Sequence, residues 1–151
     1  MQAFNNLSKN NNKMKLLLYG SVAPEISDVF ERIKKANAAI IHIGWVPAKE
    51  TYKYFFASDL ACFPGTHSTL WEEAVGFGLP AIFKRWDGIT QIDLNGNCIL
   101  INEPINDFSL SEVLMSIISN KECFEGMKNV ARTKGMEMFS YSRIAKYSIE
   151  Q

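Results

Sequence analysis

The sequence predicts an α/β fold, in which a parallel sheet carries helices on both faces. Short apolar runs of strand length alternate along the chain with segments whose apolar residues recur at helical spacing. The run over residues 60–63 is apolar throughout, as in a strand buried on both faces of a parallel sheet. With 151 residues, 47% hydrophobic residues and a formal net charge of zero, the chain suits a single globular domain.

The order of the elements follows from these patterns. Strands are predicted over residues 15–19, 39–43, 60–63, 81–83 and 98–101. Helices are predicted over residues 1–8, 25–36 and 48–57, around residue 73, along the apolar stripes within 110–118 and 124–131, and after residue 140. Pro24 suits a first helical turn, and Asn95-Gly96 predicts a hairpin-like turn before the last strand. This rhythm is typical of parallel strands joined by crossover helices.

The loop after the third strand is the first candidate for a binding site. Four residues with hydroxyls or an imidazole follow Pro64-Gly65: Thr66, His67, Ser68 and Thr69. The spacing of Thr69 and Glu72 predicts a capping box and the start of a helix. Free N–H groups in its first turn favour a phosphate. The carboxylate of Glu73 can accept from two sugar hydroxyls, so the segment suits a nucleotide with a sugar attached.

Short motifs in this region and on either side of it resemble one enzyme family. The run over residues 73–80, Glu-Ala-Val-Gly-Phe-Gly-Leu-Pro, is similar to the Glu-Ala-x-x-x-Gly-x-Pro signature of GT-B glycosyltransferases, in their C-terminal, nucleotide-sugar-binding domain. The resemblance extends to residues 16–21, 41–47 and 54–60, and to Phe139-Ser140-Tyr141 before the last helix. Together the motifs cover nearly the whole chain, and it resembles the family-4-like, or group 1, branch.

The resemblance implies a Rossmann-like sheet, the C-terminal half of a GT-B fold. It also implies a glycosyltransferase that moves a sugar from a nucleotide-diphosphate sugar to a glycan or lipid-linked acceptor in bacterial surface polysaccharide synthesis. The helix start and nearby cations would stabilise the departing diphosphate, so neither a metal nor another cofactor is expected. Two alternatives stay open: a noncatalytic nucleotide-sugar-binding subunit of a split enzyme, and a fragment of a GT-B nucleotide-sugar epimerase. The sugar, the base, the acceptor and the stereochemical outcome are not specified.

The start of the chain departs from the family. Residues 1–14 are predicted to form a residual helix and linker, and residues 15–151 the donor-binding domain. The family's domain opens with a strand and a basic loop, which are absent before residue 15. In a 3-2-1-4-5-6 strand order this strand is central, so we expect an internal start within a longer enzyme, a closing up of the other strands, or a partner chain in the gap. Because the acceptor-binding half is also absent, the isolated chain is expected to lack turnover, and no catalytic residue is assigned.

The resemblance, together with the rule that ligands bind beyond the carboxyl ends of parallel strands, selects the candidate binding residues. They are Gly20, Ser21, Trp45, Val46, Thr66, His67, Ser68, Thr69, Glu73, Lys84 and Arg85. Glu73 matches the second of the family's paired glutamates, which faces the ribose. The first has no counterpart in this rebuilt loop, so Thr66, His67 and Ser68 are expected to make the donor contacts.

Several of these residues have a structural alternative. His67 can be a loop residue that only bonds the backbone, and Trp45 can cap the sheet instead of stacking on the base. Lys84 and Arg85 can form a solvated surface pair in place of a phosphate contact. A shift of one residue in the helix register would make Glu72 the ligand-facing acid.

The charge balance and the apolar runs of the sequence limit the kinds of partner and the location that we expect for the protein. A balanced charge does not indicate nucleic acid, and no apolar run approaches the roughly 18 to 20 residues of a membrane span. Without a recognisable signal peptide the cytoplasm is expected, with peripheral association of the full enzyme with the inner face of a membrane left open. The cysteines, Cys62, Cys98 and Cys123, are expected to be small buried hydrophobes. Trp71 and His42 are expected in the core.

Overall fold

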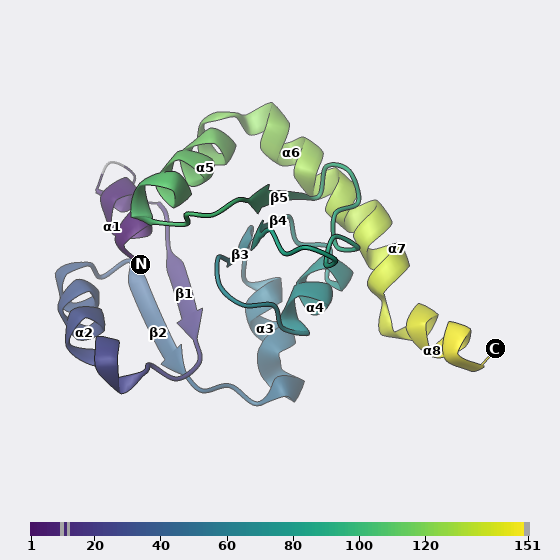
Figure 1. The fold of residues 1–151 in the computed structure, drawn as a ribbon, viewed down its shortest axis with the longest axis horizontal. Coiled ribbons are helices and arrows are strands. Elements are labelled where there is room, and N and C mark those ends of the chain that lie inside the picture. The colour runs from purple at the N-terminus through teal and green to yellow at the C-terminus, as the bar shows by residue number, and fades with distance from the viewer. Residues whose placement is uncertain (10, 12, 150–151) are drawn as a thin grey trace. The chain divides into compact units, whose positions relative to one another are not determined.

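A computed structural model describes residues 1–9, 11 and 13–149 (Figure 1). Contacts between residues divide the chain into two units, which are described separately. The first unit comprises Met1–Tyr54 and Asn106–Met115, and the second comprises Phe55–Ile105 and Ser116–Gln151. The predicted boundary between residues 14 and 15 stays a prediction, and its segments include residues 10, 12, 150 and 151, which lie outside the described ones.

The first unit contains a two-stranded parallel sheet. Its elements are α1 (Gln2–Ser8), β1 (Leu16–Tyr19), α2 (Ser27–Ala36), β2 (Ile40–Gly44) and the first parts of α3 (Thr51–Phe56) and α5 (Asp107–Ser119). In the register of β1 and β2, Leu16 lies opposite Ile40. The helix predicted from residue 25 begins with a 3-10 turn over Pro24–Ile26, because the fixed φ of Pro24 suits a first turn.

Side chains of His42 and Asn37 connect the sheet and the helices of the first unit. Nε2 of His42 lies 3.0 Å from the carbonyl oxygen of Gly20, and its ring meets the edge of Phe30 at 4.8 Å. His42 is therefore hydrogen-bonded, but it is only half-buried, so its expected place in the core is not confirmed. The side-chain amide of Asn37 donates to Oδ1 of Asn5 at 3.0 Å and to Oγ of Ser8 at 2.7 Å. The residue that ends α2 is thereby tied to α1.

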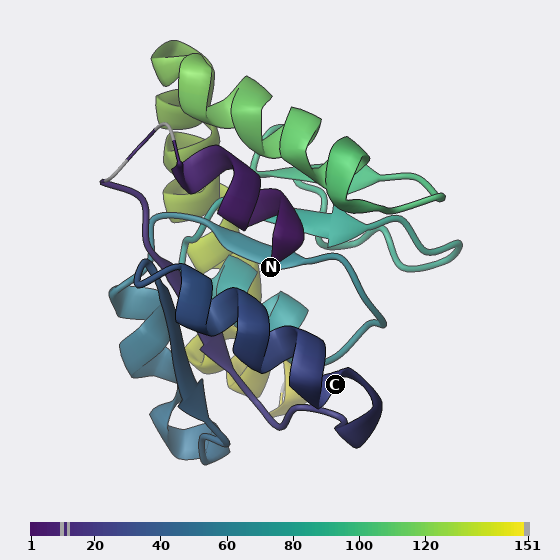
Figure 2. The ribbon, with the colours of Figure 1, turned by 90° about the vertical axis from the view of Figure 1, so that its left-hand side faces the viewer.

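The helix α1 also lies beside the first part of α5, as Figure 2 shows. There Oγ of Ser111 donates to the carbonyl oxygen of Ala3 at 3.5 Å. Residues at the two ends of the unit's sequence are therefore neighbours in space.

The second unit contains a three-stranded parallel sheet in the order β3-β4-β5 (Figure 1). Its elements are β3 (Ala61–Phe63), α4 (Leu70–Gly76), β4 (Ala81–Lys84), β5 (Cys98–Ile101), α6 (Lys121–Val130), α7 (Met136–Phe139) and α8 (Tyr141–Ile149). Trp71 is completely buried and stacks on Phe83, with ring centroids 4.7 Å apart. The core prediction for Trp71 is therefore confirmed.

The connection between β4 and β5 differs from the prediction. The two strands are parallel, so Asn95-Gly96 does not form a hairpin turn. Both residues have a positive φ, of 59° and 122°, which asparagine and glycine tolerate. The buried side chain of Asn97 holds the loop, accepting from the amide of Leu94 at 2.7 Å and donating to the carbonyl of Ile92 at 2.9 Å.

Close packing against α4 depends on glycine. A π-helical segment, Ala131–Gly135, joins α6 to α7 and passes the C-terminal end of α4. A Cβ atom at Gly135 would lie 2.5 Å from the carbonyl oxygen of Val75, and one at Gly76 would lie 2.6 Å from that of Phe139. Gly78 adds a positive φ of 74°. The glycines of the 73–80 motif therefore serve helix packing.

The predicted α/β class with parallel strands is confirmed, but the strands form two sheets. Among the described residues, no backbone pairing joins β1 and β2 to β3, β4 and β5. The described strands thus form a two-stranded and a three-stranded parallel sheet. Within the described ranges, no helix combines the length and the apolarity that a bilayer span requires.

Candidate functional site

The carboxyl ends of β3 and β4 are linked by side chains from the loops that follow them. Nε1 of Trp86 donates to the carbonyl oxygen of Gly65 at 3.5 Å, and Nε2 of Gln91 donates to Oε1 of Glu72 at 3.1 Å. The loop after β4 is thus tied both to the loop after β3 and to α4. Parallel strands present these loops at the same edge of the sheet, where α/β folds bind ligands.

The same carboxylate oxygen of Glu72 also engages His67. Nε2 of His67 lies 3.0 Å from it, and the imidazole meets the edge of the Trp71 ring at 5.1 Å. Oε2 of Glu72 is buried and has no hydrogen-bond partner within the described part of the chain. Glu72 therefore points into the protein, and the alternative that exchanges it with its neighbour is not supported.

The predicted capping box is wrong. Thr69 has helical dihedral angles, φ −57° and ψ −19°, and its side chain makes no capping hydrogen bond. A capping residue needs an extended backbone for its oxygen to reach the next amides, and Glu72 is engaged by His67 and Gln91 instead. Because α4 has only seven residues, we expect side chains, and not the dipole of this helix, to bind a ligand here.

Glu73 occupies the first turn of α4 and is half-buried. Desolvation, followed by the charge of Glu73, raises the pKa of Tyr141, the first residue of α8, above its usual value. The carboxylate of Glu73 is therefore within electrostatic reach of the start of α8.

The two cations after β4 differ in their surroundings. Lys84 forms an ion pair with Glu103 and lies over the ring of Trp86, 4.6 Å from its centroid. Arg85 is exposed, and the structure shows no ion pair for its guanidinium among the described residues. Of the two, Arg85 is the better candidate for a phosphate contact, since the charge of Lys84 is already offset.

The remaining candidates of the second unit lie in the loop before α4. Thr66 and Thr69 are exposed, whereas His67 and Ser68 are half-buried. Hydroxyl groups at these positions can serve as hydrogen-bond donors to an anion.

Four predicted site residues belong to the first unit. Gly20, with a φ of 119°, donates its amide to the carbonyl oxygen of Gly44 at 2.7 Å where β1 and β2 end, and Ser21 follows it in an exposed position. Trp45 is 72% exposed and Val46 is half-buried. Such exposure does not fit a tryptophan that caps the sheet, and it leaves the indole accessible to a planar ligand.

Sequence reasoning missed two partners of these residues. Gln91 and Glu103 carry no motif, and only the fold brings them to Glu72 and Lys84.

The cysteines are not all buried as predicted. Cys62 and Cys123 are exposed and Cys98 is half-buried, since Cys123 lies in the first turn of an outer helix and Cys62 alternates along its strand with buried Ala61. Desolvation nevertheless raises the pKa of Cys62 to about 11. Within the described residues no three His, Cys, Asp or Glu side chains gather as a metal site would require.

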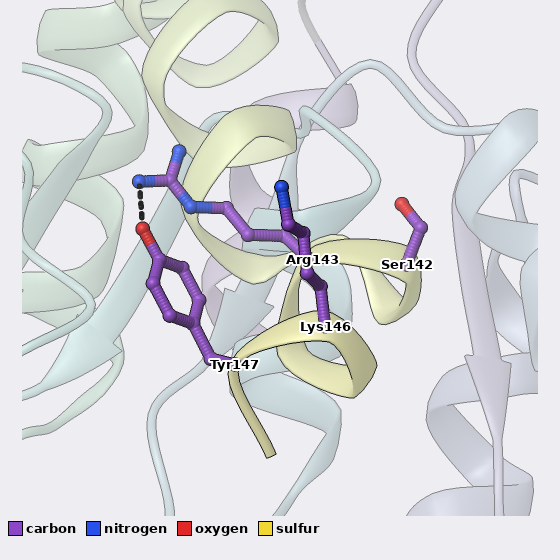
Figure 3. Close-up of a pocket in the computed structure, with 4 residues that line it drawn as sticks. All are labelled: Ser142, Arg143, Lys146 and Tyr147. Atoms are coloured by element: carbon purple, nitrogen blue, oxygen red, sulfur yellow. Dashed lines mark hydrogen bonds between the residues drawn. The ribbon is translucent and has the colours of Figure 1, made fainter. Parts of the chain in front are cut away.

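A surface hollow of about 400 Å³ lies elsewhere, along α8 (Figure 3). Its lining comes from that helix alone: Ser142, Arg143, Lys146 and Tyr147. Arg143 is held by the hydroxyl of Tyr147 at 3.1 Å and by Oε1 of Glu137 at 2.5 Å. Ligand sites are usually enclosed by several elements, and this hollow contains no predicted site residue, so we do not regard it as the binding site.

Comparison with solved structures identifies the fold. A UDP-GlcNAc 2-epimerase from Neisseria meningitidis bound to UDP-GlcNAc has a TM-score of 0.75 at 14% identity, over 99% of this chain and 40% of that one. A sucrose-phosphate synthase from Thermosynechococcus elongatus gives 0.71 at 15% identity, over 99% and 40%. The pneumococcal O-GlcNAc transferase GtfA, in complex with UDP and GlcNAc, gives 0.71 at 14% identity, over 99% and 31%.

These similarities show a Rossmann-like α/β fold like that of a GT-B C-terminal domain. The chain spans well under half the length of each of these proteins. No protein-family model matches the sequence, and no curated protein matches it either.

Proposed function

We propose that this chain is the donor-binding part of a glycosyltransferase, which moves a sugar from a nucleotide-diphosphate sugar to a glycan or lipid-linked acceptor. The observation that carries the proposal is the placement of Glu73 within this fold. A half-buried carboxylate lies in the helix that follows β3, and the resemblance assigns that position to the ribose. Two of the similar structures hold uridine nucleotides, so UDP is the first ligand to test.

The chemistry expected of the second unit is binding and orientation. Glu73 accepts hydrogen bonds from the two ribose hydroxyls, and Arg85 offsets the charge of the diphosphate. Thr66 and Ser68 donate to the sugar or the phosphates. Contacts of Gly20, Ser21, Trp45 and Val46 with the base and phosphates stay predictions that rest on the resemblance.

Transfer itself needs an acceptor site that the assigned residues do not provide. We therefore expect binding without turnover from the isolated chain, and activity when an acceptor-binding domain or partner chain is present. Since the diphosphate is offset by protein groups, binding is expected to be independent of divalent metal. A role in bacterial surface polysaccharide synthesis, in the cytoplasm or at the inner face of the membrane, completes the proposal.

A second candidate is a nucleotide-sugar epimerase, which the similarity to the enzyme from Neisseria meningitidis favours. An epimerase changes the configuration of the sugar without any acceptor. Incubating the chain, with and without candidate partner domains, with UDP-GlcNAc and following the sugar by NMR separates the two: an epimerase yields a new UDP-sugar, whereas a transferase leaves the configuration unchanged until an acceptor is added.

Calorimetric titration tests nucleotide binding directly. The wild type is titrated with UDP, GDP and ADP, first without metal and then with magnesium. The variants are Glu73→Gln and, as a control on the same helix, Glu72→Gln. Loss of a charge-assisted hydrogen bond is expected to weaken UDP binding by about tenfold or more in Glu73→Gln, while Glu72→Gln keeps the affinity because Glu72 faces His67 and Gln91.

Saturable binding of one nucleotide, unaffected by magnesium and weakened only in Glu73→Gln, supports the proposal. A folded wild-type sample that binds none of the three nucleotides contradicts it. An equal loss in both variants would instead assign the effect to the stability of α4.

A further inference from the structure

We propose that His67 recognises the sugar of the bound nucleotide-diphosphate sugar, because its Nδ1 accepts a hydrogen bond from one of the sugar hydroxyls. Glu72 is the positioning residue that holds the imidazole for this contact. This inference rests on the proposed function and extends it from the nucleotide to the sugar. The hydrogen bond between His67 and Glu72 and the packing of the His67 ring on Trp71 carry the inference.

The imidazole of His67 is held at the start of α4. Its Nε2 lies 3.0 Å from Oε1 of Glu72, and its ring meets the edge of the Trp71 ring, with centroids 5.1 Å apart and planes at 79°. Trp71 is completely buried, so it gives the imidazole a fixed surface to pack on. The His67 side chain is still 30% exposed. The ring therefore has a defined orientation and an accessible part.

Glu72 is itself fixed, and it selects the tautomer of His67. Its Oε1 also accepts from Nε2 of Gln91 at 3.1 Å, and its Oε2 is buried. An ionised carboxylate only accepts hydrogen bonds, so Nε2 of His67 must carry the proton in this contact. In a neutral imidazole the other nitrogen, Nδ1, is then unprotonated and acts as an acceptor.

Nδ1 of His67 is accessible to a ligand. Among the described residues it has no hydrogen-bond partner, and in contrast to Oε2 of Glu72 it is not buried. His67 lies in the same loop as Thr66 and Ser68, between β3 and α4. Loops at the carboxyl ends of parallel strands are where α/β folds bind ligands, so an acceptor nitrogen is present at the candidate site.

The chemistry of Nδ1 favours a sugar hydroxyl over a phosphate. Charged phosphate oxygens are acceptors and offer no proton to an unprotonated nitrogen, whereas a hydroxyl can donate. In the proposed complex the ribose hydroxyls are assigned to Glu73, so the hydroxyl that donates to His67 belongs to the transferred sugar. UDP ends at the diphosphate, and this contact is therefore absent from its complex.

The test compares UDP with its sugar conjugates. UDP, UDP-glucose and UDP-GlcNAc are titrated at pH 8 into the wild type, His67→Gln and His67→Asn. The amide nitrogen of glutamine takes the place of Nε2 and can donate to Glu72, but no acceptor replaces Nδ1. Asparagine is the matched control, because its amide oxygen takes the place of Nδ1. If another nucleoside diphosphate binds in place of UDP, its sugar conjugates are used.

We expect His67→Gln to weaken at least one UDP-sugar about three- to tenfold more than it weakens UDP. For His67→Asn this difference should be clearly smaller. An equal effect of His67→Gln on UDP and on both UDP-sugars overturns the inference, since it assigns His67 to the phosphates or to the structure of the loop. Equal differences in the two variants overturn it as well, because an acceptor at the place of Nδ1 would then have no effect.

The wild type separates this inference from the proposed function. If it binds UDP but neither UDP-sugar, the inference fails and nucleotide binding stands. If it binds no nucleoside diphosphate and no sugar conjugate, the proposed function fails, and the role of His67 fails with it.

A ligand-free measurement tests the tautomer. Long-range 1H–15N NMR spectra distinguish a protonated from an unprotonated imidazole nitrogen, and His67→Gln assigns the signals, since the sequence contains two histidines. At pH 8 we expect Nε2 of His67 to carry the proton and Nδ1 to be unprotonated. A proton on Nδ1, in the other tautomer or in an imidazolium, overturns the inference, because that nitrogen could not accept from a hydroxyl.

Discussion

The central strand of the second unit and the strands of the first unit have the same parallel geometry but different burial. In β4, Ala81, Ile82 and Phe83 are all buried. In β1 no residue is buried, and in β2 only Ile40 is. Parallel strands are normally covered on both faces, so the second unit has the burial that this architecture requires and the first unit has it only in part.

This difference predicts uneven stability. The second unit joins ten buried residues into one core around Trp71, whereas hydrogen bonds and few buried apolar residues hold the first unit. Segments with little buried apolar contact open at low cost. The first unit is therefore expected to exchange its amide hydrogens faster, and mutations are expected to cost more in the second.

The largest loss of stability is expected from a substitution at Gly135, where the second unit has no space for a side chain. In Gly135→Ala the new Cβ atom would meet the carbonyl oxygen of Val75 at 2.5 Å, so α4 and the π-helical segment must separate. We expect a loss of at least about 2 kcal/mol in the free energy of unfolding, measured by urea denaturation. Gly126→Ala in α6 is the control: with open space around it, it should be stabilising by about 0.5–1 kcal/mol. Equal effects would contradict the packing described here.

The next prediction compares the stability cost of truncating an isoleucine in β4 with the cost of the same change in β2. Ile82 in β4 is completely buried, and Ile41 in β2 is 43% exposed. Ile82→Ala should cost about 2–5 kcal/mol because it leaves a cavity, whereas Ile41→Ala should cost less than about 1 kcal/mol. The midpoints of urea denaturation give both values. Similar costs for the two variants would contradict the expected difference in stability between the two units.

A smaller effect concerns alkaline pH. Desolvation, followed by the charge of Asp93, raises the pKa of Cys98 to about 12, from an ordinary value of 9.0. Between these values the unfolded chain loses the thiol proton and the folded chain keeps it, so stability falls as pH rises from about 9 to about 12. Cys98→Ala should reduce this fall relative to the wild type, in unfolding experiments at pH 7 and pH 10. An identical pH dependence would contradict the shift.

Much of this fold was predictable from local patterns. Short apolar runs placed all five strands to within about a residue, and the glycines and proline of the 73–80 motif marked the end of α4. The separation into two sheets was not predicted, because local patterns do not specify which strands pair. The hairpin expected at Asn95-Gly96 was wrong, because the same dipeptide also suits a loop between parallel strands.

The contacts around the predicted site residues could not be predicted from the sequence. The choice between Glu72 and Glu73 depended on the partners His67 and Gln91, and the ion pair of Lys84 depended on Glu103. These partners come from separate loops, and no spacing in the sequence reveals them. The capping box failed because Thr69 is already helical, which a residue pattern does not specify.

Hydrogen exchange of the wild type with and without UDP tests the central claim most directly, because it locates the ligand without assuming a site. At a UDP concentration near the wild-type Kd, the account predicts slower exchange in residues 64–73 and 85–91, and far less slowing in Glu73→Gln. Protection confined to the hollow along α8, or equal protection of residues 64–73 in Glu73→Gln, would contradict it.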